Sequence, residues 1–267
     1  MTATKFQAIV KNYYQTNGRD LPWRHTANPY RIVVSEIMLQ QTQVSRVLIK
    51  YPEWLKKFPT WKSLASASTA DVIKSWQGLG YNRRALALKK IAEKVVSEYK
   101  GKLPKDPEIL ETFPGIGPAT ARSICAFAFN LPVVFIETNI RRVYLYHFFA
   151  GKTGITDYEL RPTIEKTLDK KNPREWYWAL MDYGSYLAKQ VENPNRKSKH
   201  YSKQSKFAGS RRQMRGEILK LLKFQTSITL QQVEKLFPER REEVEAVFSQ
   251  LAKEGFIIVR RGRAVLQ

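Results

Sequence analysis

A glycine-rich turn and the carboxylate that follows it are the residues of this sequence with the clearest chemical potential. Gly115, Gly117 and Pro118 form the turn, an apolar segment follows, and Glu137 and Asn139 come next. Glycine accepts positive φ and close backbone approach, and proline suits the first turn of a helix, so N–H groups at this helix start are able to hold a phosphate. The alternative is a turn that only joins two packed helices.

A second carboxylate, Glu36, falls in a segment with helical apolar spacing. Its neighbours are apolar: Val34, Ile37 and Met38. This setting predicts a partly buried acid with a raised pKa, whereas a solvated face residue is the alternative.

Two polar or flexible segments accompany these carboxylates. Residues 39–43 form an amide-rich cluster at an expected helix junction. The alternative to a functional role is that these residues only cap a helix and lie on the surface. Residues 78–81 form a second glycine turn, which ends in Tyr81. That ring either inserts into a DNA stack or packs in the core.

Charge favours a polyanionic partner. The 267 residues carry 46 Lys and Arg against 24 Asp and Glu, a formal net charge of +22. Nucleic acid is the first candidate and an anionic membrane the second. We find neither a signal peptide nor a long apolar run, so we expect an intracellular protein of the cytoplasm or nucleoid. The single cysteine, Cys125, excludes an intrachain disulfide and a cluster held by cysteines, and we expect it to be buried.

Apolar spacing predicts helices along most of the chain, and therefore an all-α fold. The expected helices are 5–14, 30–38, 44–58, 68–76, 82–99, 123–129, 140–149, 157–168 and 173–188, with 21–24 as a loop. From residue 213 a shorter pattern follows, with helices at 217–222, 230–237 and 241–253 and a hairpin over 256–266 that turns near Gly262.

Several motifs in register resemble the MutY-type adenine DNA glycosylases. They are residues 21–24, 35–44, 78–81, 114–117 and 139–143. This family is part of the helix-hairpin-helix superfamily, which also includes endonuclease III, and the similarity covers about residues 5–187. It implies two helical lobes with DNA across the cleft between them and the target base flipped out of the helix.

The resemblance also implies roles for individual residues. Glu36 matches the acid that protonates the leaving adenine, Glu137 takes the place of the family's aspartate near the sugar, and Asn139 matches the asparagine beside it. Breaking an N-glycosidic bond needs a proton for the base and negative charge near the cationic sugar, which two carboxylates in unlike environments supply. The expected DNA contacts, with Gln41 and Tyr81 at the wedge, are Gln40, Gln41, Thr42, Tyr81, Asn82, Gly115, Gly117, Ala119, Thr120, Arg196, Lys197 and Lys199.

The sequence departs from the family in three places. Glu137 is one methylene longer than the aspartate that it replaces. Ala119 stands where bifunctional relatives carry a lysine and adenine-specific members carry Ser or Tyr, so no amine is available for strand cleavage. The iron–sulfur cysteines are missing after Gly184, and a basic stretch, 189–212, follows instead. That stretch is either a linker or, as we prefer, a phosphate-binding loop.

The chain is therefore expected to have three parts: a glycosylase domain (1–188), the basic loop (189–212) and a winged-helix-like domain (213–267). In the last of these, the acidic third helix should be repelled by phosphates, and the wing is the better DNA contact through Arg260, Arg261 and Arg263. This domain stands in place of the family's module that recognises 8-oxoguanine, so the sequence constrains the choice of target base less than it constrains the other properties.

These features predict a monofunctional DNA glycosylase of base excision repair, most simply one that removes adenine opposite guanine or 8-oxoguanine. The alternatives are a glycosylase for thymine or uracil mismatched with guanine, and a lesion-binding protein without catalysis. We expect a monomer that binds double-stranded DNA with a mismatched or damaged base, and no metal or other cofactor.

Overall fold

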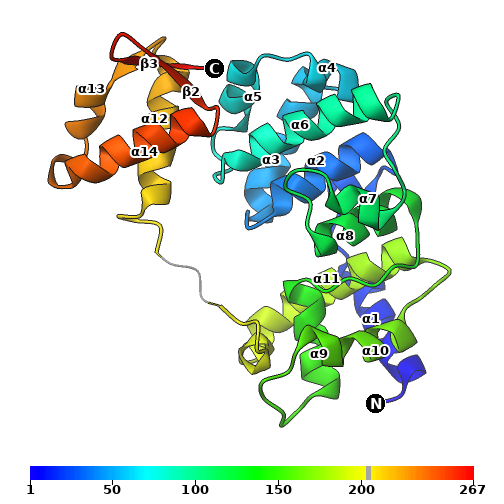
Figure 1. Cartoon of the computed structure of the whole chain (residues 1–267). Coiled ribbons are helices and arrows are strands. Elements are labelled where there is room, and N and C mark those ends of the chain that lie inside the picture. Colours follow the sequence, from blue (N-terminus) through cyan, green and yellow to red (C-terminus); the bar gives the residue numbers. More distant parts are fainter. Residues whose placement is uncertain (203–205) are drawn as a thin grey trace. The chain divides into compact units, whose positions relative to one another are not determined.

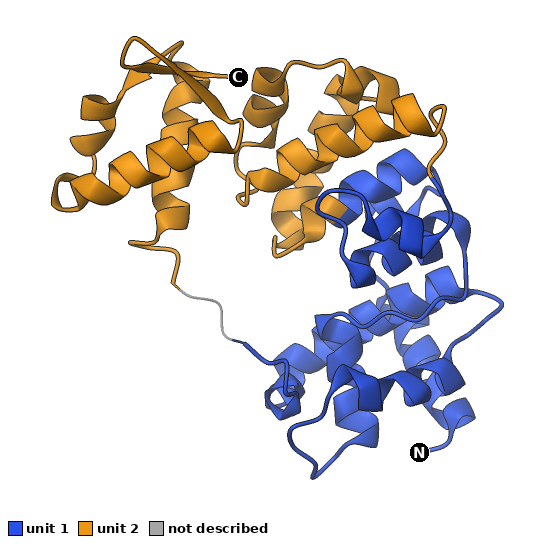
Figure 2. Ribbon diagram, viewed as in Figure 1, with its two compact units in different colours: residues 1–36, 104–203 blue, residues 37–103, 204–267 orange. Residues whose placement is uncertain are grey.

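The computed structural model describes residues 1–202 and 206–267 and divides them into two compact units (Figures 1 and 2). Unit 1 comprises residues 1–36 and 104–203, and unit 2 comprises residues 37–103 and 204–267. The boundary at Glu36 falls inside one helix, α2 (Pro29–Leu39). Helices dominate both units, as the sequence predicts for this fold class. Within the described residues, no helix is long and apolar enough to cross a membrane.

Unit 1 packs its helices around an aromatic core. Phe6 lies against Tyr144, Phe148 and Trp176, with ring centroids 4.9–5.9 Å apart. The helices that supply this core and the layer around it are α1 (Ala3–Asn17), α8 (Pro118–Phe129), α9 (Thr138–Phe148), α10 (Asp157–Thr167) and α11 (Pro173–Gln190). Burying such large rings supplies much of the driving force for folding this unit.

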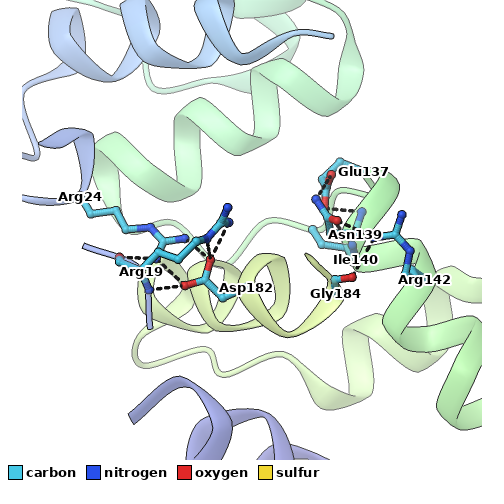
Figure 3. A network of polar contacts seen from close by, with 8 residues as sticks. All are labelled: Arg19, Arg24, Glu137, Asn139, Ile140, Arg142, Asp182 and Gly184. Atoms are coloured by element: carbon cyan, nitrogen blue, oxygen red, sulfur yellow. Dashed lines mark hydrogen bonds and ion pairs between the residues drawn. The ribbon is translucent and has the colours of Figure 1, made fainter. Parts of the chain in front are cut away.

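A buried ion pair fastens the N-terminal segment of unit 1 to α11 (Figure 3). Asp182 accepts hydrogen bonds from Arg24 at 2.7 and 2.8 Å and from the Arg19 backbone N–H at 2.8 Å. Burial alone would raise the pKa of Asp182, but the two guanidinium groups hold it below its ordinary value. Residues 21–24, expected as a loop, contain a short 3₁₀ turn (Pro22–Arg24) that brings Arg24 to this carboxylate.

The first part of unit 2 is helical and closes with a long helix. It contains α3 (Val44–Lys57), α4 (Trp61–Ala65), α5 (Thr69–Trp76) and α6 (Arg83–Glu98). Neither α4 nor α7 (Pro107–Glu111), which lies in unit 1, was predicted from the sequence. Both are five residues long, too short to show a period, and both begin at a side-chain cap, Thr60 and Asp106 respectively.

The C-terminal part of unit 2 has the expected three helices and hairpin, although the helix expected at 217–222 spans 211–224 and the one expected at 230–237 ends at 234. Its elements are α12 (Arg211–Phe224), β1 (Ile228–Thr229), α13 (Leu230–Glu234), α14 (Arg241–Lys253), β2 (Ile257–Arg260) and β3 (Arg263–Leu266). The strands form an antiparallel sheet in the order β1-β3-β2, in which Ile258 pairs with Val265. This is the arrangement of helices and strands expected of a winged helix. Strand β1, which has only two residues, was not predicted from the sequence.

The C-terminal segment packs against the first part of unit 2. Ile73 of α5 is buried in the same apolar cluster as the core of the C-terminal helices, and Leu86 of α6 packs on that cluster. Glu254 accepts from Arg215 at 2.5 Å and also pairs with Arg83, which holds its pKa at about 2 although burial opposes this. Contacts therefore connect residues 211–267 to α5 and α6 directly.

Candidate active site

Glu36 lies on α2, beside residues that the helix buries completely. Ile37 and Met38 are 0% exposed, and Glu36 itself is half-buried. Ser123, on α8, donates a hydrogen bond from its hydroxyl to Oε2 of Glu36. Burial raises the pKa of Glu36 to about 7, the bond from Ser123 opposes this, and the charge of Glu137 adds to the rise. Glu36 is therefore an acid that is substantially protonated near neutral pH, as its apolar neighbours predict.

Glu137 caps the N-terminus of α9 with its own side chain (Figure 3). Its Oε1 accepts hydrogen bonds from the backbone N–H groups of Asn139 at 2.7 Å and Ile140 at 2.8 Å. Burial raises the pKa of Glu137, while these two N–H groups and the neighbouring Arg142 and Arg141 oppose the rise. The helix N-terminus thus favours negative charge at the position where this carboxylate lies.

Asn139 connects the capping carboxylate to a buried arginine (Figure 3). Its amide donates to Oε2 of Glu137 at 3.3 Å, and its Oδ1 accepts from Arg142 at 2.6 Å. Arg142 also donates to the carbonyl of Gly184 at 2.8 Å, and burial lowers its pKa although Glu137 opposes this. The chain of contacts fixes the orientation of Asn139 and supplies positive charge behind Glu137.

Gly184 is required where α11 crosses α9. A Cβ at this position would lie 2.7 Å from the Cβ of Asn139 and closer still to its carbonyl oxygen. No side chain fits there unless one helix moves, so glycine sets the distance between the helix that carries Asn139 and its neighbour.

The glycine-rich turn leads into α8 as the sequence predicts, with one correction. Gly115 has a φ of +77°, but Gly117 has a φ of −94° and serves as the N-cap of α8, so positive φ is used at Gly115 only. Pro118 occupies the first position of the helix, and Ala119 and Thr120 complete its first turn. Gly115, Gly117 and Ala119 are exposed, and a Cβ added at Gly117 meets no atom within 4 Å.

Unit 2 contains the expected contacts at 40–42 and 81–82, and a buried arginine joins these two segments. Arg84 donates to the carbonyls of Met38 and Gln40 at 2.9 and 2.6 Å, and to Gly80 at 2.9 Å. It also donates to the Thr42 hydroxyl at 2.9 Å. Burial lowers the pKa of Arg84 to about 10. These bonds bind the end of α2 to the glycine turn of residues 78–81.

The two residues expected at the DNA wedge share an uncommon backbone conformation. Gln41 has a φ of +52° and Tyr81 a φ of +46°, the left-handed region that side chains other than glycine rarely adopt. Tyr81 is half-buried between two guanidinium groups, with Arg84 5.4 Å and Arg212 5.6 Å from the ring centroid. Arg212, from α12, also donates to the Tyr81 hydroxyl at 2.5 Å. The C-terminal segment therefore contacts the expected wedge residue directly.

The start of the basic loop is attached to unit 1 through backbone contacts. The Ile155 N–H donates to the Lys197 carbonyl at 3.0 Å, and the Lys199 N–H donates to the Ile155 carbonyl at 2.9 Å. Asn195, which is buried, donates to the Thr138 carbonyl at the start of α9 at 3.1 Å. Arg196 and Lys199 are exposed, and Arg196 pairs with Glu192. Within this loop, residues 203–205 lie outside the described part of the chain.

The structure thus brings the expected residues together in two sets. Unit 1 carries Glu36, Glu137 and Asn139 with the glycine turn and the loop at 194–199, whereas unit 2 carries residues 40–42 and 81–82. Ser123, Arg84 and Arg142 were not among the residues predicted from the sequence. Arg142 lies within the motif 139–143 that contains Asn139, which was a usable signal, while Ser123 and Arg84 are ordinary residues of a helix until the fold is known. Among the described residues, no group of three or more His, Cys, Asp or Glu is placed to hold a metal ion.

Known proteins resemble this chain in sequence and in fold. Residues 34–170 match the model of the HhH-GPD superfamily base excision DNA repair protein. An adenine DNA glycosylase of Mycobacterium tuberculosis is 46% identical over 132 residues, which are 49% of this chain and 43% of the relative. The adenine DNA glycosylase of Homo sapiens is 34% identical over 194 residues, which are 68% of this chain and 36% of the relative. The matched segment is therefore less than half the length of these two relatives.

A solved structure of a thermostable thymine-DNA glycosylase resembles the chain with a TM-score of 0.64 at 25% identity. The match covers 72% of this chain and 90% of that structure.

Proposed function

Because the chain belongs to the HhH-GPD superfamily of base excision DNA repair proteins, we propose that it is a monofunctional DNA glycosylase. It hydrolyses the N-glycosidic bond of a mispaired or damaged base that has been flipped out of duplex DNA. Adenine opposite guanine or 8-oxoguanine is the preferred target. The names of the mycobacterial and human relatives support adenine, and the net charge of +22 supports a nucleic-acid partner.

The observation that carries this proposal is the pair of carboxylates in unlike environments. Glu36, with a pKa of about 7, is protonated often enough to give its proton to a ring nitrogen of the leaving base. Glu137, held at the N-terminus of α9, places negative charge near the sugar as positive charge develops there. Two backbone N–H groups and two arginines favour the charged form of Glu137, and no cation of the described residues acts in this way on Glu36, so one group is suited to act as the acid and the other as a charged stabiliser.

The remaining residues of unit 1 hold this pair in position. Asn139 and Arg142 orient Glu137 through the contacts described above. In this proposal water attacks the sugar after the base leaves, and Glu137 accepts the proton of that water. Ala119 has no amine, so no Schiff base forms at its position and the product is an intact abasic site.

The glycine turn and the basic loop position the DNA. The start of α8 presents backbone N–H groups to a phosphate, and the space beside Gly117 is open. Further phosphate contacts come from the loop at 194–199, and residues 40–42 and 81–82 of unit 2 act on the base stack. Residues 213–267 add a winged helix whose wing carries Arg260, Arg261 and Arg263, all exposed.

A panel of duplexes under single-turnover conditions tests this function. The panel contains adenine opposite 8-oxoguanine, adenine opposite guanine, and thymine or uracil opposite guanine, each analysed with and without alkali and with borohydride. We expect adenine release with strand breaks after alkali only. A borohydride-trapped complex would contradict the monofunctional mechanism.

The runner-up function is removal of thymine or uracil from mismatches with guanine, and the resemblance to a thymine-DNA glycosylase favours it. Pyrimidine release without adenine release on the same panel would select it. Binding to these duplexes without release of any base would instead indicate a lesion-binding protein.

A further inference from the structure

Ser123 lies next to the proposed acid, Glu36, and the mechanism proposed above gives it no role. It is 4% exposed on α8 and belongs to the same unit as Glu36. Its hydroxyl lies within hydrogen-bond distance of two acceptors, Oε2 of Glu36 and the carbonyl oxygen of Thr120 at 3.0 Å. A serine hydroxyl has one proton, so it donates to only one of these acceptors at a time.

The choice between the acceptors depends on the charge of Glu36. While Glu36 is neutral, the Thr120 carbonyl competes well, because bonds from serine to the carbonyl of the preceding helical turn are common. Once Glu36 has lost its proton, the carboxylate is the stronger acceptor, because hydrogen bonds to ionised groups are roughly twice as strong as neutral ones. The bond from Ser123 to Glu36 therefore strengthens as the proton leaves.

From this geometry we propose that Ser123 is a positioning residue for the acid, a role that rests on the proposed function. While Glu36 keeps its proton, the Thr120 carbonyl is able to hold the Ser123 hydroxyl proton. When the proton of Glu36 passes to a ring nitrogen of the base, Ser123 turns its own proton from Thr120 to Oε2 and stabilises the new carboxylate. One proton moves from Glu36 to the base, and Ser123 keeps its own.

An interaction that is stronger after proton transfer than before it lowers the barrier of that transfer. The same bond also favours the ionised form of Glu36 in the free protein. Among the surrounding elements, the charged group that acts on Glu36 is Glu137, and its negative charge opposes the ionisation of Glu36. Arg141 and Arg142 act on Glu137 and favour its charged form. Removing the hydroxyl should therefore affect two separate measurements, the titration of Glu36 and the rate of base release.

The test compares wild type with Ser123→Ala and Ser123→Cys, since a thiol is a weaker donor of nearly the same size. First, the side-chain carboxyl carbons of ¹³C-labelled glutamate are titrated by NMR in the free protein, with Glu36→Gln to assign the signal. The pKa of Glu36 should rise by about one pH unit in Ser123→Ala and by less in Ser123→Cys. Cys125→Ser, also buried on α8, should leave it unchanged.

Second, base release is measured for the same proteins against pH. The pH above which the rate falls should rise with the pKa of Glu36, and Ser123→Ala should be roughly 10- to 100-fold slower at low pH, where Glu36 is protonated in every variant. An unchanged pKa of Glu36 in Ser123→Ala would overturn the inference. If wild type releases no base at all, the proposed function fails, and the NMR titration still decides whether Ser123 acts on Glu36.

Discussion

Replacing Glu36 with glutamine should make the protein more stable while it removes base release. The environment raises the pKa of Glu36 from 4.5 to about 7, so between these pH values the folded protein holds a proton that the unfolded chain has released. Because the folded state then binds more protons, the free energy of unfolding falls as pH rises through this window and is constant above it. Glutamine has nearly the same shape, accepts a hydrogen bond from Ser123 and carries no charge, so Glu36→Gln avoids this loss.

The size of the effect follows from the pKa. At about 1.4 kcal/mol for each pH unit, the shift of Glu36 corresponds to an upper limit of about 3 kcal/mol. The stability gained by Glu36→Gln should therefore grow from near zero below about pH 4.5 to a few kcal/mol above about pH 7. The rate of base release should fall roughly 10²- to 10⁴-fold, while duplex binding is retained.

Urea unfolding of both proteins at several pH values between about 5 and 8 measures this prediction. Glu108→Gln on α7, where the side chain is exposed in the same unit, is the matched control and should show no comparable gain. A Glu36→Gln protein that is less stable than wild type at high pH, or a gain in stability that does not change with pH, would refute this prediction.

Four further predictions concern the scaffold and the DNA contacts. Gly184→Ala should lower the free energy of unfolding in urea by about 1–3 kcal/mol, because the new Cβ overlaps Asn139. Unchanged stability would show that α9 and α11 move apart at little cost. Tyr81→Gly should relieve the positive φ but lose the contacts with Arg84 and Arg212, and it should lose its preference for mismatched over matched duplex in binding titrations; an unchanged preference would remove Tyr81 from the wedge. Replacing three basic residues of the loop (Arg196, Lys197 and Lys199) with alanine should reduce the salt dependence of duplex binding by roughly up to three units of logarithmic slope. An unaltered slope would indicate that the loop is only a linker. The purified protein should contain no iron, since Cys125 is its only cysteine, and stoichiometric iron in elemental analysis would overturn this.

The local sequence pattern was sufficient to predict most helices of the fold. The apolar spacing of 82–99 predicts α6 within one residue at each end, and the hairpin turn at Gly262 follows from a glycine between two apolar runs. By contrast, β1 consists of two residues that become a strand only because Ile228 pairs with Ala264. Elements of this kind depend on contacts between distant residues, so no local pattern reveals them.

The candidate site divides in the same way. Glu36 and Asn139 were recognisable from motifs and apolar neighbours. Ser123 reaches Glu36 across 87 positions of sequence, and Arg212 reaches Tyr81 across 131. Arg84, next to another arginine at a helix start, looks like a surface residue, but the fold buries it among the carbonyls that it joins. Polar side chains that bridge distant segments acquire their role only from tertiary structure.

The central claim is that this chain releases a base from DNA with Glu36 as the acid. The most direct measurement is chromatography of the free base released from a duplex with adenine opposite 8-oxoguanine, with enzyme in excess, for wild type and Glu36→Gln. We expect free adenine in an amount equal to the alkali-labile sites for wild type, and at least roughly 10²-fold slower release for the variant. Adenine release by Glu36→Gln at the wild-type rate, or no free base from wild type on any duplex of the panel, would contradict it.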